Sequence, residues 1–264
     1  MTMDILHAIL SVLSGTLVGF TLGLLGGGGS VLAVPLMVYV VGVRQPHLAI
    51  GTSALAVAAN ALAGLMSHAR ADNVNWRCGA VFSAAGIAGA LGGSTLGKLV
   101  DGQRLLFLFA LLMLVVAAAT YRGRGHCGDA AVTVNRQNLP RVLLLGLGVG
   151  ALSGFFGIGG GFLIVPALVA ATGMPIYRAI GTSLIAVSAF GITTALNYAA
   201  SGMLDWTLAG TFIIGGVGGT ILGTASSRRL SSQKGWLNTI FASGIVLVAI
   251  TMLYRSWTAL AAGG

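Results

Sequence analysis

The sequence has very few acidic residues: none of its 264 positions is glutamate, and it contains five acidic residues in all. These aspartates fall at the ends of the long apolar runs or between them, at Asp4, Asp72, Asp101, Asp129 and Asp205. Carboxylates inside membrane helices commonly serve as proton relays in pumps and transporters. Their scarcity here argues against a carboxylate relay within the apolar segments.

Cysteine is also scarce, and the two that occur, Cys78 and Cys127, cannot form a disulfide framework. Neither these cysteines nor the four histidines have the spacing of a metal site, and no nucleophile is paired with a base. The sequence therefore predicts no metal, no cofactor and no enzymatic activity.

Charged residues make up only 7% of the chain, and the mean hydropathy is +0.95. The apolar runs between the charges are long enough to cross a bilayer core of about 30 Å, which takes about 20 helical residues. They lack the period-two alternation of a membrane β-barrel, so helices are expected. We therefore expect an all-α polytopic membrane protein that has the lipid bilayer as a partner.

The net charge of +9 comes from basic residues that lie between the apolar runs and build no basic face. This arrangement is typical of topology signals, and no nucleic-acid partner is expected. Asp4 stands where a cleaved leader would carry positive charge, so the first apolar segment is expected to be retained.

A glycine-rich stretch occurs twice, as GLLGGGGSVLAVPLMVYVVG from Gly23 to Gly42 and as GFFGIGGGFLIVPALVAATG from Gly154 to Gly173. The sequence AIGTS follows each copy, at 49–53 and at 179–183. Further residues match at shifts of 130 or 131 positions, so the chain consists of two homologous halves. We assign 1–121 to a first transmembrane repeat, 122–138 to a polar linker and 139–264 to a second transmembrane repeat.

Each half opens with an apolar segment that is too long for one crossing. The first, Ile5–Gly42, would measure about 57 Å as a continuous helix. The glycines at 26–29 each cost about 1 kcal/mol in a helix relative to alanine, so a re-entrant or hairpin break is expected there. The second half repeats this pattern over 139–173. Three further segments follow each broken one, over 47–66, 78–99 and 105–121, and over 177–197, 206–226 and 236–254.

The distribution of lysine and arginine indicates how the halves are oriented. If each broken segment turns back, the halves are inverted, and one side of the membrane receives ten basic residues while the other receives four. If each broken segment crosses once, the split is seven to seven. Because a positive-inside bias is expected, we favour two inverted repeats with the linker cytoplasmic and both termini outside.

The two breaks are also the predicted binding site. Half-helices that begin near Ser30 and Gly161 would direct their N-termini at one central point, where partial positive charge favours an anion. Glycine also allows close approach of a ligand to backbone amides. The predicted substrate-binding residues are Gly27, Gly28, Gly29, Ser30, Thr52, Ser53, Asn60, Gly159, Gly160, Gly161, Thr182, Ser183 and Asn197.

Several of these side chains also have structural interpretations. The hydroxyl groups of the AIGTS stretches can bond their own backbone or cap a helix. The two asparagines can form bonds between helices. His68, Arg70 and Arg178, at the predicted cytoplasmic end, can form a gate or vestibule, or can anchor the chain at the interface. Helix packing is the expected role of six glycines at helical spacing: Gly86, Gly89, Gly93, Gly216, Gly219 and Gly223.

The chain resembles the TauE/SafE family of sulfite exporters in three features. These are the duplicated glycine break followed by proline, the AIGTS stretches, and the Asn-Val-Asn-Trp at 73–76, which is echoed by Leu-Asp-Trp at 204–206. The resemblance covers nearly the whole chain. It implies a plasma-membrane permease for a small sulfur oxyanion that works without ATP. The two halves of the chain differ from each other at some equivalent positions: Ser30 against Gly161, Arg44 against Pro175 and His68 against Tyr198.

Secondary transport by alternating access is the expected mechanism, with the pathway between the two halves, so that a monomer can suffice. An anion that leaves a cell with a negative interior gains about 2.3 kcal/mol per charge per 100 mV, so export needs no coupling ion. An ion-coupled importer of sulfoacetate or another small organosulfonate is the main alternative. A membrane scaffold that holds a partner protein is a further alternative.

Overall fold

A computed structural model describes residues 5–122, 138–229 and 234–262, and all regular elements within these ranges are helices. The first half contains α1 (Ile5–Leu25), the 3₁₀ helix η1 (Gly26–Leu32), α2 (Ala33–Tyr39), α3 (Pro46–Ala69), α4 (Trp76–Leu99) and α5 (Gly102–Arg122). The second half contains α6 (Leu139–Phe156), α7 (Gly161–Thr172), α8 (Ile176–Ala199), α9 (Trp206–Arg229) and α10 (Lys234–Ala262). The all-α prediction is confirmed, whereas the predicted linker lies almost entirely outside the described residues.

Within the described ranges, six helices are long and apolar enough to cross a membrane: α1, α3, α4, α6, α8 and α9. The chain is therefore a multi-pass membrane protein. Both long opening segments are interrupted at the predicted glycines, because α1 ends at Leu25 and α6 ends at Phe156. The elements that follow these breaks are short, and α7 has only 12 residues.

Polar residues at the helix starts define the connections. The Asp205 side chain accepts hydrogen bonds from the backbone amides of Thr207 and Leu208, both at 3.0 Å, and thereby caps α9. At the equivalent position before α4, the Asn75 side chain accepts from the amide of Cys78 at 3.1 Å. The predicted start of the 206–226 segment is confirmed, because α9 begins at Trp206. The residue after each cap is an exposed tryptophan, as expected at a membrane interface.

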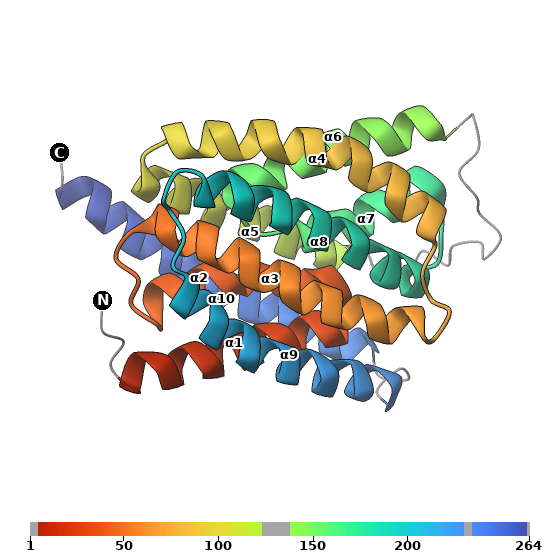
Figure 1. Cartoon of the computed structure of the whole chain (residues 1–264), viewed down its shortest axis with the longest axis horizontal. Helices are drawn as coiled ribbons and strands as arrows, with labels where there is room; N and C mark the ends of the chain where they lie inside the picture. Colours follow the sequence, from red (N-terminus) through yellow and green to blue (C-terminus); the bar gives the residue numbers. More distant parts are fainter. Residues whose placement is uncertain (1–4, 123–137, 230–233, 263–264) are drawn as a thin grey trace.

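The centre of the bundle is an antiparallel pair formed by α3 and α8 (Figure 1). Near the start of α3, Gly51 contacts Tyr198, which lies near the end of α8. Near the end of α3, His68 contacts Gly181, which lies near the start of α8. Gly51 and Gly181 correspond at a shift of 130 residues, so the same contact is made twice by equivalent parts of the two halves.

Two further pairs flank this centre, and each joins helices from different halves. Figure 1 shows α1 beside α9 along one edge of the bundle and α4 beside α6 along the other. The backbones are in direct contact: Gly19 faces Gly216 in the first pair, and Gly93 faces Ala151 in the second. A Cβ atom at any of the six glycines assigned to packing would lie against a neighbouring helix or side chain, which confirms that role.

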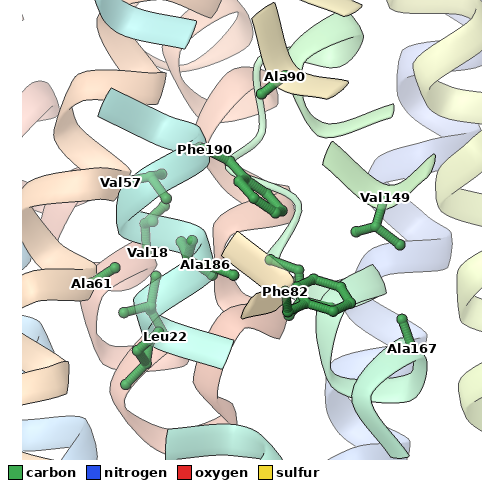
Figure 2. Packing of buried hydrophobic residues seen from close by; sticks show 14 of the residues in the cluster. Val18, Leu22, Val57, Ala61, Phe82, Ala90, Val149, Ala167, Ala186 and Phe190 are labelled. Carbon is green, nitrogen blue, oxygen red and sulfur yellow. The ribbon is translucent and has the colours of Figure 1, made fainter. Parts of the chain in front are cut away.

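Buried apolar side chains fill the space between these pairs. Val57 and Ala61 on α3 and Ala186 and Phe190 on α8 are fully buried in one cluster (Figure 2). The ring of Phe190 lies 6.2 Å from that of Phe82 on α4, centroid to centroid. This packing connects the central pair to α4.

Candidate functional site

The second break, between α6 and α7, is a glycine turn with left-handed backbone. Gly157, Gly159 and Gly160 have φ angles of 66°, 67° and 65°, which side-chain-bearing residues rarely adopt. The Gly160 carbonyl accepts hydrogen bonds from the amides of Leu163 and Ile164, at 2.9 and 3.1 Å, and so begins α7. The first amides of α7 have no intrahelical carbonyl to bind, so the N-terminus of a helix is presented at the break.

The first break has a different geometry. Residues Gly26–Leu32, which include Gly27, Gly28, Gly29 and Ser30, form the 3₁₀ helix η1, so α2 begins only at Ala33. The half-helix was predicted to begin near Ser30, and the 3₁₀ turn delays it by three residues. The breaks also differ in sequence, at Ser30 against Gly161 and at Gly27 against Ile158, and the side chain of Ile158 is fully buried.

The two breaks lie close together at the central pair. η1 packs against α7 and α8. In the second break, a Cβ atom at Gly159 would lie 3.0 Å from Val57 Cγ1 and 3.3 Å from Val187 Cγ1. Val57 and Val187 are equivalent residues of the two halves, at a shift of 130. The second break therefore reaches the middle of the α3–α8 pair.

Asn60 is the most unusual side chain near this centre. It is completely buried on α3, and neither its amide nitrogen nor its amide oxygen has a hydrogen-bond partner. It packs against Gly216 of α9, just as its counterpart Phe190 packs against Gly86 of α4. An unpaired buried amide costs about 1–3 kcal/mol, a cost that the apolar side chain of Phe190 avoids at the equivalent position.

Other buried hydroxyl groups without a protein partner were not predicted. Ser153 lies in the last turn of α6, four residues before the break, and its Oγ is unpaired. Thr194, fully buried on α8, also has an unpaired hydroxyl. The sequence carries one signal for Ser153, its position directly before the glycine stretch, and none for Thr194.

The predicted hydroxyl residues of the AIGTS stretches all have partners. The Thr52 hydroxyl accepts a hydrogen bond from the Asp205 amide at 3.1 Å, and the Thr182 hydroxyl accepts one from the Asn75 amide at 2.9 Å. These bonds hold the α8–α9 and α3–α4 connections at opposite ends of the central pair. The serines of the two stretches, Ser53 and Ser183, donate to carbonyls of their own helices, at 3.0 and 2.7 Å.

Asn197 lies away from the breaks, near the end of α8. Its side-chain amide donates to Ser94 Oγ at 2.6 Å and to Thr95 Oγ1 at 3.0 Å. Its side-chain oxygen accepts from Lys98 Nζ at 2.8 Å. The structure therefore shows the interhelical alternative for this asparagine, a polar network between α4 and α8.

The three residues predicted to form a gate lie at one end of the central pair. His68 is buried, and its ring centroid is 6.2 Å from that of Tyr177. Arg70 and Arg178 are exposed, at the end of α3 and in the first turn of α8. At the opposite end of the pair, the equivalent residues His47 and Tyr198 form the same kind of contact with the residue types exchanged, at a centroid distance of 6.3 Å.

The described residues contain no group of three or more His, Cys, Asp and Glu side chains that could hold a metal ion. Of the five aspartates, the three that are described lie between helices: Asp72, Asp101 and Asp205. None is therefore placed within a helix as a proton relay. What the centre offers a ligand is backbone amides, hydroxyl groups and an amide side chain.

Comparison with known proteins agrees with this architecture. The family model described as "Sulfite exporter TauE/SafE" matches residues 11–252. A "Probable membrane transporter protein" of Xylella fastidiosa (strain 9a5c) is 52% identical over 98% of this chain and 100% of its own. YunE of Bacillus subtilis, with the same description, is 25% identical over 94% of this chain and 97% of its own. No solved structure gives a significant match.

A multi-pass helical bundle with two helix breaks at its centre has the architecture of a membrane transporter. The chain belongs to the TauE/SafE family. This membership confirms the resemblance on which the sequence-based assignment depended.

Proposed function

We propose that this transporter exports a small sulfur oxyanion such as sulfite by alternating access, with the substrate bound where the two breaks meet the α3–α8 pair. The observation that carries this proposal is the unpartnered, fully buried amide of Asn60, three residues along α3 from Val57, which a Cβ atom at Gly159 of the second break would contact. A helix N-terminus favours negative charge, and the amide NH₂ group supplies donors for oxyanion oxygens. No carboxylate of the described residues lies within the helices to repel an anion.

The inverted arrangement of the halves is part of the proposal. A two-fold rotation that exchanges two antiparallel helices has its axis perpendicular to them. If α3 and α8 cross the bilayer, that axis lies in the membrane plane, as in transporters built from inverted repeats. The short elements α2 and α7 favour re-entrant segments, because 12 helical residues measure only about 18 Å.

The proposed orientation places the linker in the cytoplasm and both termini outside, in the plasma membrane. In Figure 1, α1 begins and α10 ends at the left end of the bundle, whereas α5 ends and α6 begins at the right. The start of α1 and the end of α10 thus lie at the opposite end of the bundle from the end of α5 and the start of α6, and this supports the proposed orientation. Two halves in one chain complete the pathway, and we propose a monomer as the transporting unit.

Sulfite flux in proteoliposomes tests the function. The membrane potential is set with a potassium gradient and valinomycin, without sodium and without a pH gradient. We expect the direction of flux to follow the imposed potential, since an uncoupled anion gains about 2.3 kcal/mol per charge per 100 mV. Empty liposomes are the control.

Two outcomes would contradict uncoupled export. Flux that appears only after sodium or protons are added indicates a coupled carrier, and uptake of an organosulfonate becomes the better assignment. No flux of sulfite, sulfoacetate or other small organosulfonates under any condition, from protein that is folded, would favour a scaffold.

Replacement of Asn60 by leucine tests the site. We expect Asn60→Leu to raise thermal stability or leave it unchanged, because the change removes an unpaired buried amide. Flux should fall about tenfold to hundredfold, the loss expected for a hydrogen bond to a charged ligand, worth about 1.5–3 kcal/mol. Thr193→Val is the control, because the Thr193 hydroxyl bonds the carbonyl of Ala189 in its own helix. Wild-type flux in Asn60→Leu would exclude this amide from the site.

A further inference from the structure

A second polar feature lies outside the central site, at the end of the bundle where α3 begins, α4 ends and α5 begins. It is a cavity of about 610 Å³. Such a volume is in the range of small-molecule sites and exceeds what a single small anion fills. The side chains that give it chemical character are those of Arg44, His47, Lys98, Asp101 and Gln103.

The two cations of this cavity, Arg44 and Lys98, outnumber its one carboxylate, Asp101. Lys98 Nζ donates three hydrogen bonds, all to uncharged acceptors: the carbonyl and side-chain oxygens of Asn197, at 3.2 and 2.8 Å, and Ser201 Oγ, at 2.9 Å. Asp101 instead accepts from the amides of Gln103 and Arg104, at 3.1 and 3.2 Å, and so caps α5. In the ranges that the structure describes, neither Arg44 nor Lys98 forms an ion pair with a carboxylate.

The donors of the cavity suit an oxyanion. Because its three protons are already engaged, Lys98 contributes a fixed positive field rather than a direct ligand contact. Arg44 is exposed, and its planar guanidinium matches two oxygens of a sulfonate or sulfite group. The N-terminus of α3, which begins at Pro46, adds partial positive charge on the same side.

A short series of side-chain contacts along α3 leads from the cavity to the second break. His47 lines the cavity, and its ring lies 6.3 Å from that of the fully buried Tyr198. Lys98 Nζ lies 6.0 Å from the centre of the same tyrosine ring. One turn further along α3, Ile50 contacts Gly157 of the second break. A floor formed by His47 and Tyr198 thus separates the cavity from the break.

We propose that this cavity is an oxyanion antechamber, in which Arg44 and the field of Lys98 hold a sulfonate or sulfite anion before it enters, or after it leaves, the central site. The antechamber rests on the proposed function, since it names a second site for the same class of substrate. The phosphate of a lipid headgroup shares this chemistry. A solute is favoured because the cavity lies against His47, whose ring is 6.3 Å from that of the buried Tyr198 in the central pair.

Thiol modification tests the antechamber without requiring turnover. Gln103→Cys places a thiol in the cavity of a chain in which Cys78 and Cys127 are replaced by serine. Two methanethiosulfonate reagents are compared, one carrying a sulfonate and one carrying a trimethylammonium group. We expect Lys98→Gln to lower the rate ratio of the anionic to the cationic reagent roughly threefold to tenfold, the effect of one partly screened charge nearby.

Methanesulfonate serves as the ligand probe, because sulfite itself reacts with thiosulfonates. It should slow modification in vesicles of neutral phosphatidylcholine, and less so after Lys98→Gln. Arg77→Gln is the matched control: it removes the cation at the opposite end of the same helix and should leave both readouts unchanged.

Three results would overturn the antechamber: no protection by methanesulfonate, a reagent ratio that Lys98→Gln does not change, or protection that comes only from added phosphatidylglycerol. The last result would assign the cavity to a lipid headgroup. If methanesulfonate protects the thiol from modification but the protein gives no sulfite flux in proteoliposomes, the transport proposal is refuted and the oxyanion cavity still stands.

Discussion

Replacement of Gly160 by valine is expected to abolish most anion flux while the bundle remains assembled. Gly160 has a φ of 65°, where a residue with a side chain is strained by about 1–2 kcal/mol. A Cβ atom there would also lie 2.6 Å from Ser153 Cβ and 2.8 Å from Ser153 Oγ. The break must therefore shift and carry the N-terminus of α7 with it. Loss of one hydrogen bond to a charged substrate would lower flux about tenfold to hundredfold.

Gly173→Val separates the local effect from backbone strain. Gly173 ends α7 with a φ of 73°, but a Cβ atom at this position would meet nothing within 4 Å. The two variants therefore share the strain of a left-handed residue and differ in their distance from the breaks. Flux is measured in proteoliposomes at equal amounts of monodisperse protein. Equal losses in both variants would contradict a substrate role for the second break.

A single methyl group at Gly93 is expected to prevent α4 from packing on α6. A Cβ atom at Gly93 would collide with the carbonyl oxygen of Ala151, which belongs to the backbone and cannot rotate away. We expect Gly93→Ala to lower stability by roughly 1–3 kcal/mol or more, as overpacking does. The melting temperature and the monodisperse fraction in detergent are the measurements.

The neighbouring glycine provides an internal control of opposite sign. Gly92 is exposed on the same helix, and a Cβ atom there would meet nothing within 4 Å. Gly92→Ala should therefore stabilise the protein by up to about 1 kcal/mol through helix propensity alone. Equal melting temperatures for the two alanine variants would contradict a close backbone contact between α4 and α6.

The helices and their interruptions could be predicted from the sequence because their signals are local. Asp205 caps a helix two and three residues away, and the consecutive glycines break a helix wherever it packs. The placement of Asn60 in a buried helix segment followed equally from its apolar neighbours. That the Asn60 amide has no hydrogen-bond partner can be seen only once the surrounding helices are in place.

The remaining features depend on contacts between distant residues. The partner of Thr52 is the amide of Asp205, and that of Asn197 is Lys98; neither pair leaves a local pattern. Hydrophobic periodicity shows which face of a helix is buried but not which helix covers it, so the pairing of α1 with α9 was not predicted. The two breaks differ in shape, and the burial of Ile158 in the second is likewise a contact that the sequence does not show.

The pairing of α1 with α9 and of α6 with α4 has a consequence for synthesis in the cell. The glycine face of α1 meets its partner only after about 200 further residues have been translated, which takes roughly 10–40 s at the usual rate of elongation. During that time the glycine face of α1 is exposed to lipid or to other helices. The α4–α6 pair can form as soon as α6 has been made, whereas α1 waits for α9, so the N-terminal helix completes its packing late in translation.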